Sequence, residues 1–133
     1  MKAPTVLFRL TKMTENPHNP LAVVVLIRKD PFDSPKGVEA IRMALGLGSG
    51  VNPVDIILMG NAPFLLSEER EKLVDYETLE KYISNFEDAD KPFYVDESFL
   101  LKHPDFKTPY KFESVSRGDI AKILETGKKF LIF

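Results

Sequence analysis

Polar and charged side chains follow three aliphatic runs of this sequence, in places that a parallel sheet would bring to one edge. The candidate ligand-binding residues are Arg28, Lys29, Ser34, Asn61, Asp96 and Ser98. Arg28 and Lys29 are able to pair with an anion, and the free backbone N–H groups of a helix beginning near Ser34 would support it. A buried carboxylate such as Asp96 beside one of these cations would be a starting point for acid–base chemistry. The alternative is structural, because strand-end loops are commonly polar and solvated.

The loop after the first aliphatic run lacks the composition of a phosphate-binding loop. A P-loop needs several glycines and a Lys-Ser/Thr pair, so that backbone N–H groups surround the phosphate oxygens. Here Gly37 stands alone, and Asp30 and Asp33 would repel an anion. The stretch GLGSG, residues 46–50, follows a helical pattern instead of joining a strand to a helix, which predicts a helix stop and a turn. The first loop is therefore predicted to turn a corner at the rim of a possible site.

Residues that carry metals or nucleophilic chemistry are sparse in this sequence. His18 and His103 lie far apart near prolines and have no partner at ligand spacing, which favours solvated loop positions over a metal site. Cysteine is absent, so disulfides, thiolate metal sites and cysteine mechanisms are excluded. No Ser-His-Asp order or carboxylate pair stands out. We therefore predict no metal and no cofactor, and we favour a function without catalysis.

The composition is typical of a globular protein with one domain. The chain has 133 residues, of which 44% are hydrophobic and 29% charged, and this length is enough to bury a core. The formal net charge of −2 argues against a nucleic-acid binder, which is usually basic. No apolar run approaches the roughly 20 residues that cross a bilayer, and Arg9 and Lys12 interrupt any signal-peptide core. We expect a cytoplasmic protein with neither nucleic acid nor a membrane among its partners.

Aliphatic runs alternate with helical patterns along the chain, and this alternation predicts the fold class. Strands are expected at residues 21–27, 54–60, 92–98, 110–115 and 128–133. Helices are expected after the Ser34-Pro35 pair, over residues 76–86, and from a capping box of Ser116 and Asp119 up to Gly127. Strands that alternate with helices form a parallel sheet covered on both faces. The prediction is a three-layer α/β/α sandwich, flavodoxin-like, with a mostly parallel five-stranded sheet.

Two segments are harder to place in that sandwich. Residues 1–20 alternate apolar and polar positions and then reach the proline-containing TENPHNP, which predicts an N-terminal extension, either an extra strand or an arm on a neighbouring subunit. Residues 21–133 are the predicted single domain. A lone amphipathic helix cannot easily bury the consecutive Phe64, Leu65 and Leu66. They are expected to pack inside the domain or, as we favour, against another subunit.

The chain from residue 21 to residue 133 resembles the DsrE/DsrF/DsrH family, whose members include the small subunits of bacterial sulfur-relay complexes. The likeness is nearest to the DsrF (TusC-like) branch. It rests on stretches in the family's order and spacing, namely VVVLIRKDPFDSPKGVEAIRMAL, DIILMGNAPFLL, FYVDESFLLKHPDF, SVSRGDIAKIL and KKFLIF. The resemblance implies a flavodoxin-like domain that assembles into dimers, trimers or hexamers, or with cysteine-bearing subunits of the family.

The same resemblance implies a role for the end of the third strand. Active family members carry a persulfide on one cysteine where that strand meets a short helix, and the likeness puts Asp96 at this position. A carboxylate cannot replace the cysteine, because sulfur relay needs a thiolate that both attacks and leaves. This chain is therefore expected to lack direct sulfur transfer.

Three functions follow from these observations, in decreasing order of support. The first is a non-catalytic DsrE/DsrF-like subunit, or a homo-oligomeric family member, associated with intracellular sulfur relay or sulfur oxidation. The second is a flavodoxin-like module that binds a nucleotide or another small molecule at Arg28, Lys29, Asn61 and the helix start. The third is an enzyme that uses Asp96 with Arg28 or Lys29 beside it.

Overall fold

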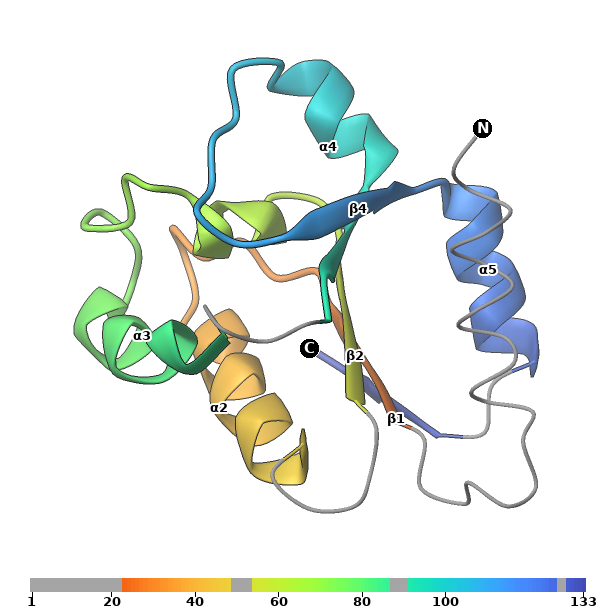
Figure 1. Ribbon diagram of the computed structural model, residues 1–133, viewed down its shortest axis with the longest axis horizontal. Helices are drawn as coiled ribbons and strands as arrows, with labels where there is room; N and C mark the ends of the chain where they lie inside the picture. The colour runs from red at the N-terminus through yellow and green to blue at the C-terminus, as the bar shows by residue number, and fades with distance from the viewer. Residues whose placement is uncertain (1–22, 49–53, 87–90, 127–128) are drawn as a thin grey trace.

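The computed structural model describes residues 23–48, 54–86, 91–126 and 129–133, and Figure 1 shows its ribbon. The strands are β1 (Val23–Ile27), β2 (Val54–Leu58), β3 (Phe93–Asp96), β4 (Phe112–Val115) and β5 (Phe130–Ile132). The helices are α2 (Lys36–Gly48), α3 (Tyr76–Ile83), α4 (Glu97–Lys102) and α5 (Arg117–Thr126), with 3-10 turns η1 (Ala62–Leu66) and η2 (Ser84–Phe86). Every predicted strand is present, although most are shorter than expected. The predicted extension at residues 1–20 and the helix end at Gly127 lie outside the described residues.

A single parallel sheet holds the described strands in the order β4-β3-β2-β1-β5. β1 pairs with β2 from Val23 opposite Val54 to Ile27 opposite Leu58. The chain crosses the sheet from β1 to β4 in one direction and then returns beyond β1 to form β5. Flavodoxin itself has the order 2-1-3-4-5, so the layers agree while the strand order differs. The return places α5 on the face opposite to α2 and α3, because right-handed crossovers in opposite directions cover opposite faces.

Alternate residues of the central strands supply two apolar clusters, one on each face of the sheet. On one face, Val25 of β1 shares a cluster with Ile41 of α2 and with residues of η1 and α3. On the other face, Val24 shares a cluster with Ile123 of α5, and Figure 1 shows this helix apart from α2 and α3. All the residues of β1 are buried, since both sides of the strand are covered. The predicted three-layer α/β/α sandwich is confirmed.

Side-chain caps hold the first turns of α2 and α5, as the sequence predicts. Ser34 Oγ accepts a hydrogen bond from the backbone N–H of Lys36 (3.2 Å). Ser116 Oγ accepts from the Asp119 N–H (3.0 Å), and Asp119 Oδ2 accepts from the Ser116 N–H (3.4 Å). The helix stop expected at GLGSG, residues 46–50, agrees with the structure, because α2 ends at Gly48 within this stretch. Within the described ranges, no helix is both long and apolar enough to cross a membrane.

Candidate functional site

The end of β3 carries a fully buried carboxylate. Asp96 is the last residue of β3, and its side chain has no exposed surface. Its Oδ1 accepts a hydrogen bond from the N–H of Ser98 (3.1 Å), which caps α4. Its Oδ2 accepts a hydrogen bond from Nε of Arg117 (3.1 Å), whose side chain is 68% exposed. A buried charge is tolerated when it is paired and hydrogen-bonded in this way.

Arg117 is the cation beside Asp96, which corrects the predicted pairing with Arg28 or Lys29. β3 and β4 are neighbours with Asp96 opposite Val115, so the residue that begins α5 lies within reach of the carboxylate. β1, which carries Arg28 and Lys29 at its end, is separated from β3 by β2. Sequence reasoning missed Arg117 because this contact depends on the strand order.

Ser98 also differs from its prediction, since it lies in the first turn of α4 and not at the end of a strand. The strand ends at Asp96 because the side chain of that residue caps the helix that follows immediately. The bond from Ser98 to Asp96 is made by the backbone N–H of Ser98. Ser98 therefore contributes to the cap of α4, and the two residues come together as a structural unit.

A second polar group joins the loops that follow β1 and β2. Nδ2 of Asn61 donates to Oδ2 of Asp30 (2.8 Å), and Oδ1 of Asp30 accepts from the N–H of Phe32 (2.9 Å). The carbonyl oxygen of Asp30 accepts from the N–H groups of Asp33 and Ser34 (3.1 and 3.0 Å). Both carboxylate oxygens of Asp30 are therefore used in shaping the loop. This geometry supports the prediction that the loop turns a corner.

Arg28 and Lys29 remain exposed at the end of β1. The backbone of Arg28 is held by a hydrogen bond from its N–H to the carbonyl oxygen of Phe133 (2.9 Å). Its own carbonyl oxygen would lie 3.4 Å from a Cβ at Gly60, whose φ of +59° favours glycine at this turn. Among the described residues, neither Arg28 nor Lys29 has an ion-pair partner. These two cations face solvent and do not meet Asp96.

His103 belongs to an aromatic cluster, which corrects the prediction of a solvated loop histidine. Its ring centroid lies 4.5 Å from that of Phe99 and 5.0 Å from that of Phe64. Phe99 also contacts Phe64 (5.0 Å) and Phe106 (5.1 Å) in edge-to-face geometry. The half-buried His103 follows α4, and its N–H donates to the carbonyl oxygen of Phe99 (2.9 Å). The fold brings the end of α4 next to η1, and this contact between distant residues is not visible in the local sequence. His18 lies outside the described residues.

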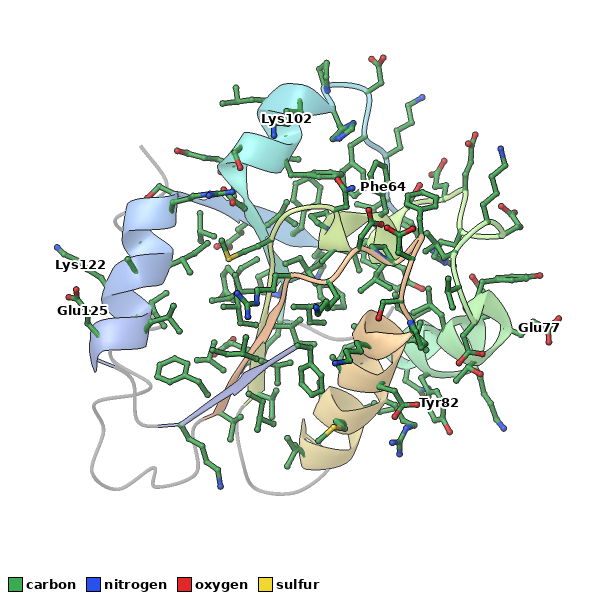
Figure 2. All side chains as sticks on the ribbon, turned by 180° about the vertical axis from the view of Figure 1, so that it is seen from behind. Phe64, Glu77, Tyr82, Lys102, Lys122 and Glu125 are labelled. Atoms are coloured by element: carbon green, nitrogen blue, oxygen red, sulfur yellow. The ribbon has the colours of Figure 1, made fainter. Side chains whose placement is uncertain are left out.

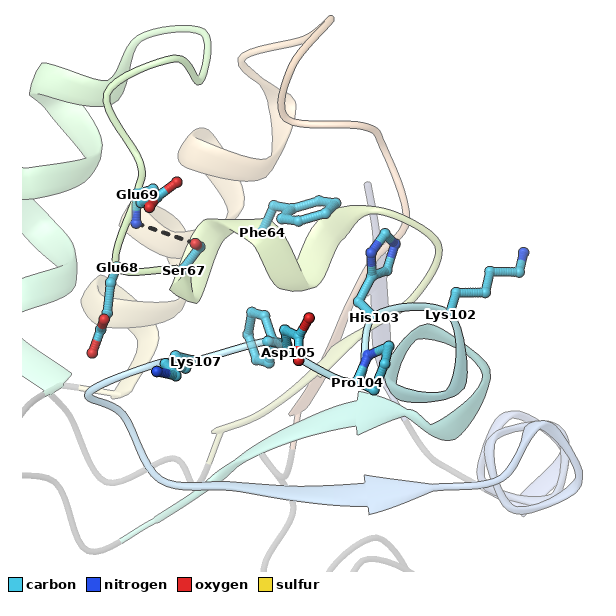
Figure 3. A pocket seen from close by; sticks show the side chains of 10 residues that line it. Phe64, Ser67, Glu68, Glu69, Lys102, His103, Pro104, Asp105 and Lys107 are labelled. Atoms are coloured by element: carbon cyan, nitrogen blue, oxygen red, sulfur yellow. Dashed lines mark hydrogen bonds between the residues drawn. The ribbon is translucent and has the colours of Figure 1, made fainter.

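A pocket of about 370 Å³ opens between η1 and the loop from α4 to β4 (Figure 3). Its lining residues are Phe64, Ser67, Glu68, Glu69, Lys102, His103, Pro104, Asp105, Phe106 and Lys107. The pocket lies beyond the carboxyl ends of β2 and β3, the edge at which open parallel sheets bind ligands. The predicted ligand-binding residues do not line it. The sequence signal nearest to it is the apolar turn that contains Phe64.

Arg70 stabilises the segment that follows η1, next to the pocket. Its Nη1 donates to the carbonyl oxygen of Ser67 (2.9 Å), and its Nη2 pairs with the Glu80 carboxylate of α3 (2.6 Å). The guanidinium carbon lies 5.7 Å from the centroid of the Tyr110 ring. Burial lowers the pKa of Arg70, but the hydrogen bond and negative charge of Glu80 outweigh it, so the pKa is raised above its ordinary value. Arg70 therefore stays charged and links three segments.

The turn η1 is mostly internal. Leu65 and Leu66 have no exposed surface and belong to the larger apolar cluster. Gly37 of α2 permits this packing, because a Cβ there would lie only 3.0 Å from Cδ1 of Leu65. Phe64 is half-buried and lies 5.2 Å, centroid to centroid, from the exposed Phe32. Leu65 and Leu66 thus pack inside the domain, and a subunit contact at this turn is predicted only through Phe64.

Within the described residues, no group of three or more histidine or acidic side chains is arranged to hold a metal ion. Figure 2 shows Phe64 and Lys102 toward one end of the molecule, whereas Lys122 and Glu125 project outward from α5. The pocket near Phe64 and the Asp96–Arg117 pair are the candidate functional features of the described residues.

The fold has a counterpart among solved structures. The crystal structure of ychN protein from E. coli matches with a TM-score of 0.68, over 84% of this chain and 98% of that chain, at 15% sequence identity. The likeness is one of fold. No protein-family model and no curated protein matches this chain.

Proposed function

We propose that this chain is a non-catalytic DsrE/DsrF-like subunit, associated with intracellular sulfur relay or sulfur oxidation. Two observations support the family assignment. The sequence from residue 21 to residue 133 carries the family-like stretches in order, and the parallel sheet with helices on both faces is the kind of fold that the resemblance implies. The likeness to the ychN protein supports the fold.

The observation that carries the non-catalytic role is the state of Asp96. It occupies the position at which the resemblance places the persulfide cysteine, and the chain has no cysteine at all. Sulfur transfer needs an accessible thiolate. Asp96 is fully buried, and its oxygens are taken up by the cap of α4 and by Arg117. Asp96 at the end of β3 therefore has a structural role, in which it connects β3 to α4 and to Arg117. In this proposal a partner protein carries out the sulfur chemistry.

The partner in this proposal is a cysteine-bearing subunit of the same family, or further copies of this chain in a homo-oligomeric member. Phe64 and Phe32 supply the apolar part of the predicted contact. Phe32 is 41% exposed, and its ring packs edge-on against that of Phe64. Exposed aromatic side chains of this kind are enriched in subunit contacts.

Native mass spectrometry of the full chain isolated from its own host tests the proposal. Co-isolation of homologous subunits that carry a cysteine, with an added sulfur atom on one of them, is the expected result. A homo-oligomer would support the alternative form of the proposal only if persulfide-bearing relay proteins bind to it. A chain isolated with no such protein, under conditions that induce sulfur metabolism, would overturn it.

A small-molecule or nucleotide-binding module is the second candidate function. It is favoured by the exposed Arg28 and Lys29, which stand beside the Asp30–Asn61 bridge between two strand-end loops. Thermal-shift measurements with nucleotides, flavins and sulfur oxyanions test it, with an Arg28→Gln/Lys29→Gln double variant as the control. Stabilisation that disappears in the double variant supports this candidate, and a flat response to every ligand argues against it.

A further inference from the structure

The pocket between η1 and the α4–β4 loop has the size and position of a ligand site. Its volume of about 370 Å³ falls within the range of small-molecule pockets, roughly 300–1,000 Å³. A hydrogen bond from the Glu68 N–H to the carbonyl oxygen of Lys107 (3.3 Å) ties its two walls together. A second bond, from the Phe106 N–H to the carbonyl oxygen of His103 (3.0 Å), shapes the loop wall. Backbone hydrogen bonds therefore fix the position of the loop relative to the segment that follows η1.

Aromatic rings form the apolar part of the pocket lining. Phe64 comes from η1, and His103 and Phe106 come from the loop. The Phe64 and His103 rings lie 5.0 Å apart, and Phe99 beneath them contacts both rings and Phe106. This network fixes the ring orientations. Aromatic faces carry negative electrostatic potential and attract organic cations.

Carboxylates supply most of the charge around those rings. Glu68, Glu69 and Asp105 line the pocket, and none of them has an ion-pair partner among the residues that the structure describes. In Figure 3 the Asp105 side chain lies between the loop and η1. In the same view the Lys102 side chain extends away from the other labelled side chains, whereas Lys107 lies between Asp105 and Glu68. The lining therefore holds three carboxylates against two ammonium groups.

We infer that this pocket binds an organic cation, a guanidinium or primary ammonium group on a short aliphatic stem. The stem would lie against Phe64 and Phe106, and the cation would be held by Asp105 and the neighbouring ring faces. Three carboxylates against two ammonium groups in the lining favour a cation over an inorganic anion. The inference does not depend on a role in sulfur relay, because the charge that it uses comes from Asp105 and not from Asp96; Phe64 belongs both to this lining and to the proposed subunit contact.

Nuclear magnetic resonance titration of the full ¹⁵N-labelled chain tests this inference. The probes are N-acetyl-arginine amide, which represents a side chain of a partner, and putrescine, which represents a free amine. N-acetyl-citrulline amide has nearly the shape of the arginine probe without its charge. Inorganic phosphate is the anionic control. We expect the cationic probes to shift backbone signals of residues 64–69 and 102–107 with Kd of about a millimolar, and citrulline to bind at least roughly tenfold more weakly.

A substitution at the exposed Asp105 distinguishes an effect on ligand binding from an effect on folding. Asp105→Asn is expected to weaken the arginine probe about tenfold while leaving the unfolding temperature unchanged. Asp33→Asn, an exposed acid on the loop after β1, is the matched control and should bind as the unaltered chain does. Tighter binding of the arginine probe than of putrescine would identify a protein side chain as the source, and the reverse would identify a free amine. Equal binding of arginine and citrulline, no binding of either cation, or an unchanged Kd in Asp105→Asn would overturn the inference.

Discussion

Nε of Arg117 at the start of α5 lies 3.1 Å from Oδ2 of Asp96 at the end of β3. The contact joins a helix on one face of the sheet to a strand whose carboxylate also caps α4. Its two partners differ sharply in burial, because Asp96 has no exposed surface and the Arg117 side chain is 68% exposed. Loss of the arginine therefore leaves a buried charge with only its backbone cap, whereas loss of the carboxylate leaves a solvated arginine.

Replacing the exposed partner should therefore destabilise the fold. We expect Arg117→Met to lower the free energy of unfolding by about 1–2 kcal/mol, a value that allows for solvent screening of the exposed guanidinium. Urea denaturation followed by circular dichroism measures this difference. Lys72→Met, at an exposed position without a described ion pair, is the control and should stay within about 0.5 kcal/mol. An Arg117→Met chain as stable as the control would show that the pair contributes nothing measurable.

The cap of α5 gives an independent prediction. Ser116→Ala removes the oxygen that accepts from the Asp119 N–H, and it should lower the free energy of unfolding by about 1 kcal/mol. The comparison variant is Ser84→Ala, at an exposed position in η2. Thermal unfolding of both variants checks the prediction. If the two alanine variants unfold at the same temperature, the capping bond does not stabilise α5.

Leucines of different burial should respond differently to the same substitution. Leu65→Ala should cost about 2–5 kcal/mol, because Leu65 is fully buried against Gly37 and the sheet. Leu101→Ala should cost less than about 0.5 kcal/mol, because Leu101 is 82% exposed. Equilibrium denaturation of the two variants measures both values. A small loss of unfolding free energy in Leu65→Ala would instead support the subunit contact that the sequence suggested for Leu65.

Phe64 should govern assembly more than stability. We expect Phe64→Glu to dissociate the oligomer or to release a cysteine-bearing partner, because a charge would be placed in the predicted apolar contact. Met43→Glu, at an exposed methionine of α2, is the matched control and should leave assembly unchanged. Size-exclusion chromatography with light scattering reports the mass of each complex, and circular dichroism confirms that each chain is folded. An identical mass for both variants and the unaltered chain would refute the contact through Phe64.

Local sequence patterns were enough to predict the five strands and three of the described helices, whereas α4 was not among the helices expected from them. β-Branched runs predicted the buried strands, and the Ser34 cap and the Ser116–Asp119 box predicted two helix starts. These features depend on interactions between residues that are close in sequence, so a short stretch of chain is enough to predict them. The α/β/α class follows from the same information, because strands alternating with helices allow few arrangements.

Only the tertiary structure decided which strand ends meet, and this determined the candidate sites. The order β4-β3-β2-β1-β5 places Arg117 beside Asp96 and keeps Arg28 apart from it. The same order and the return of the chain after α4 put His103 against Phe64 and open the pocket between them. These pairs are separated by many residues in sequence, and their contacts are selected by the packing of the whole core. Residue types at strand ends therefore indicated which groups were available, while the packing of the sheet selected their partners.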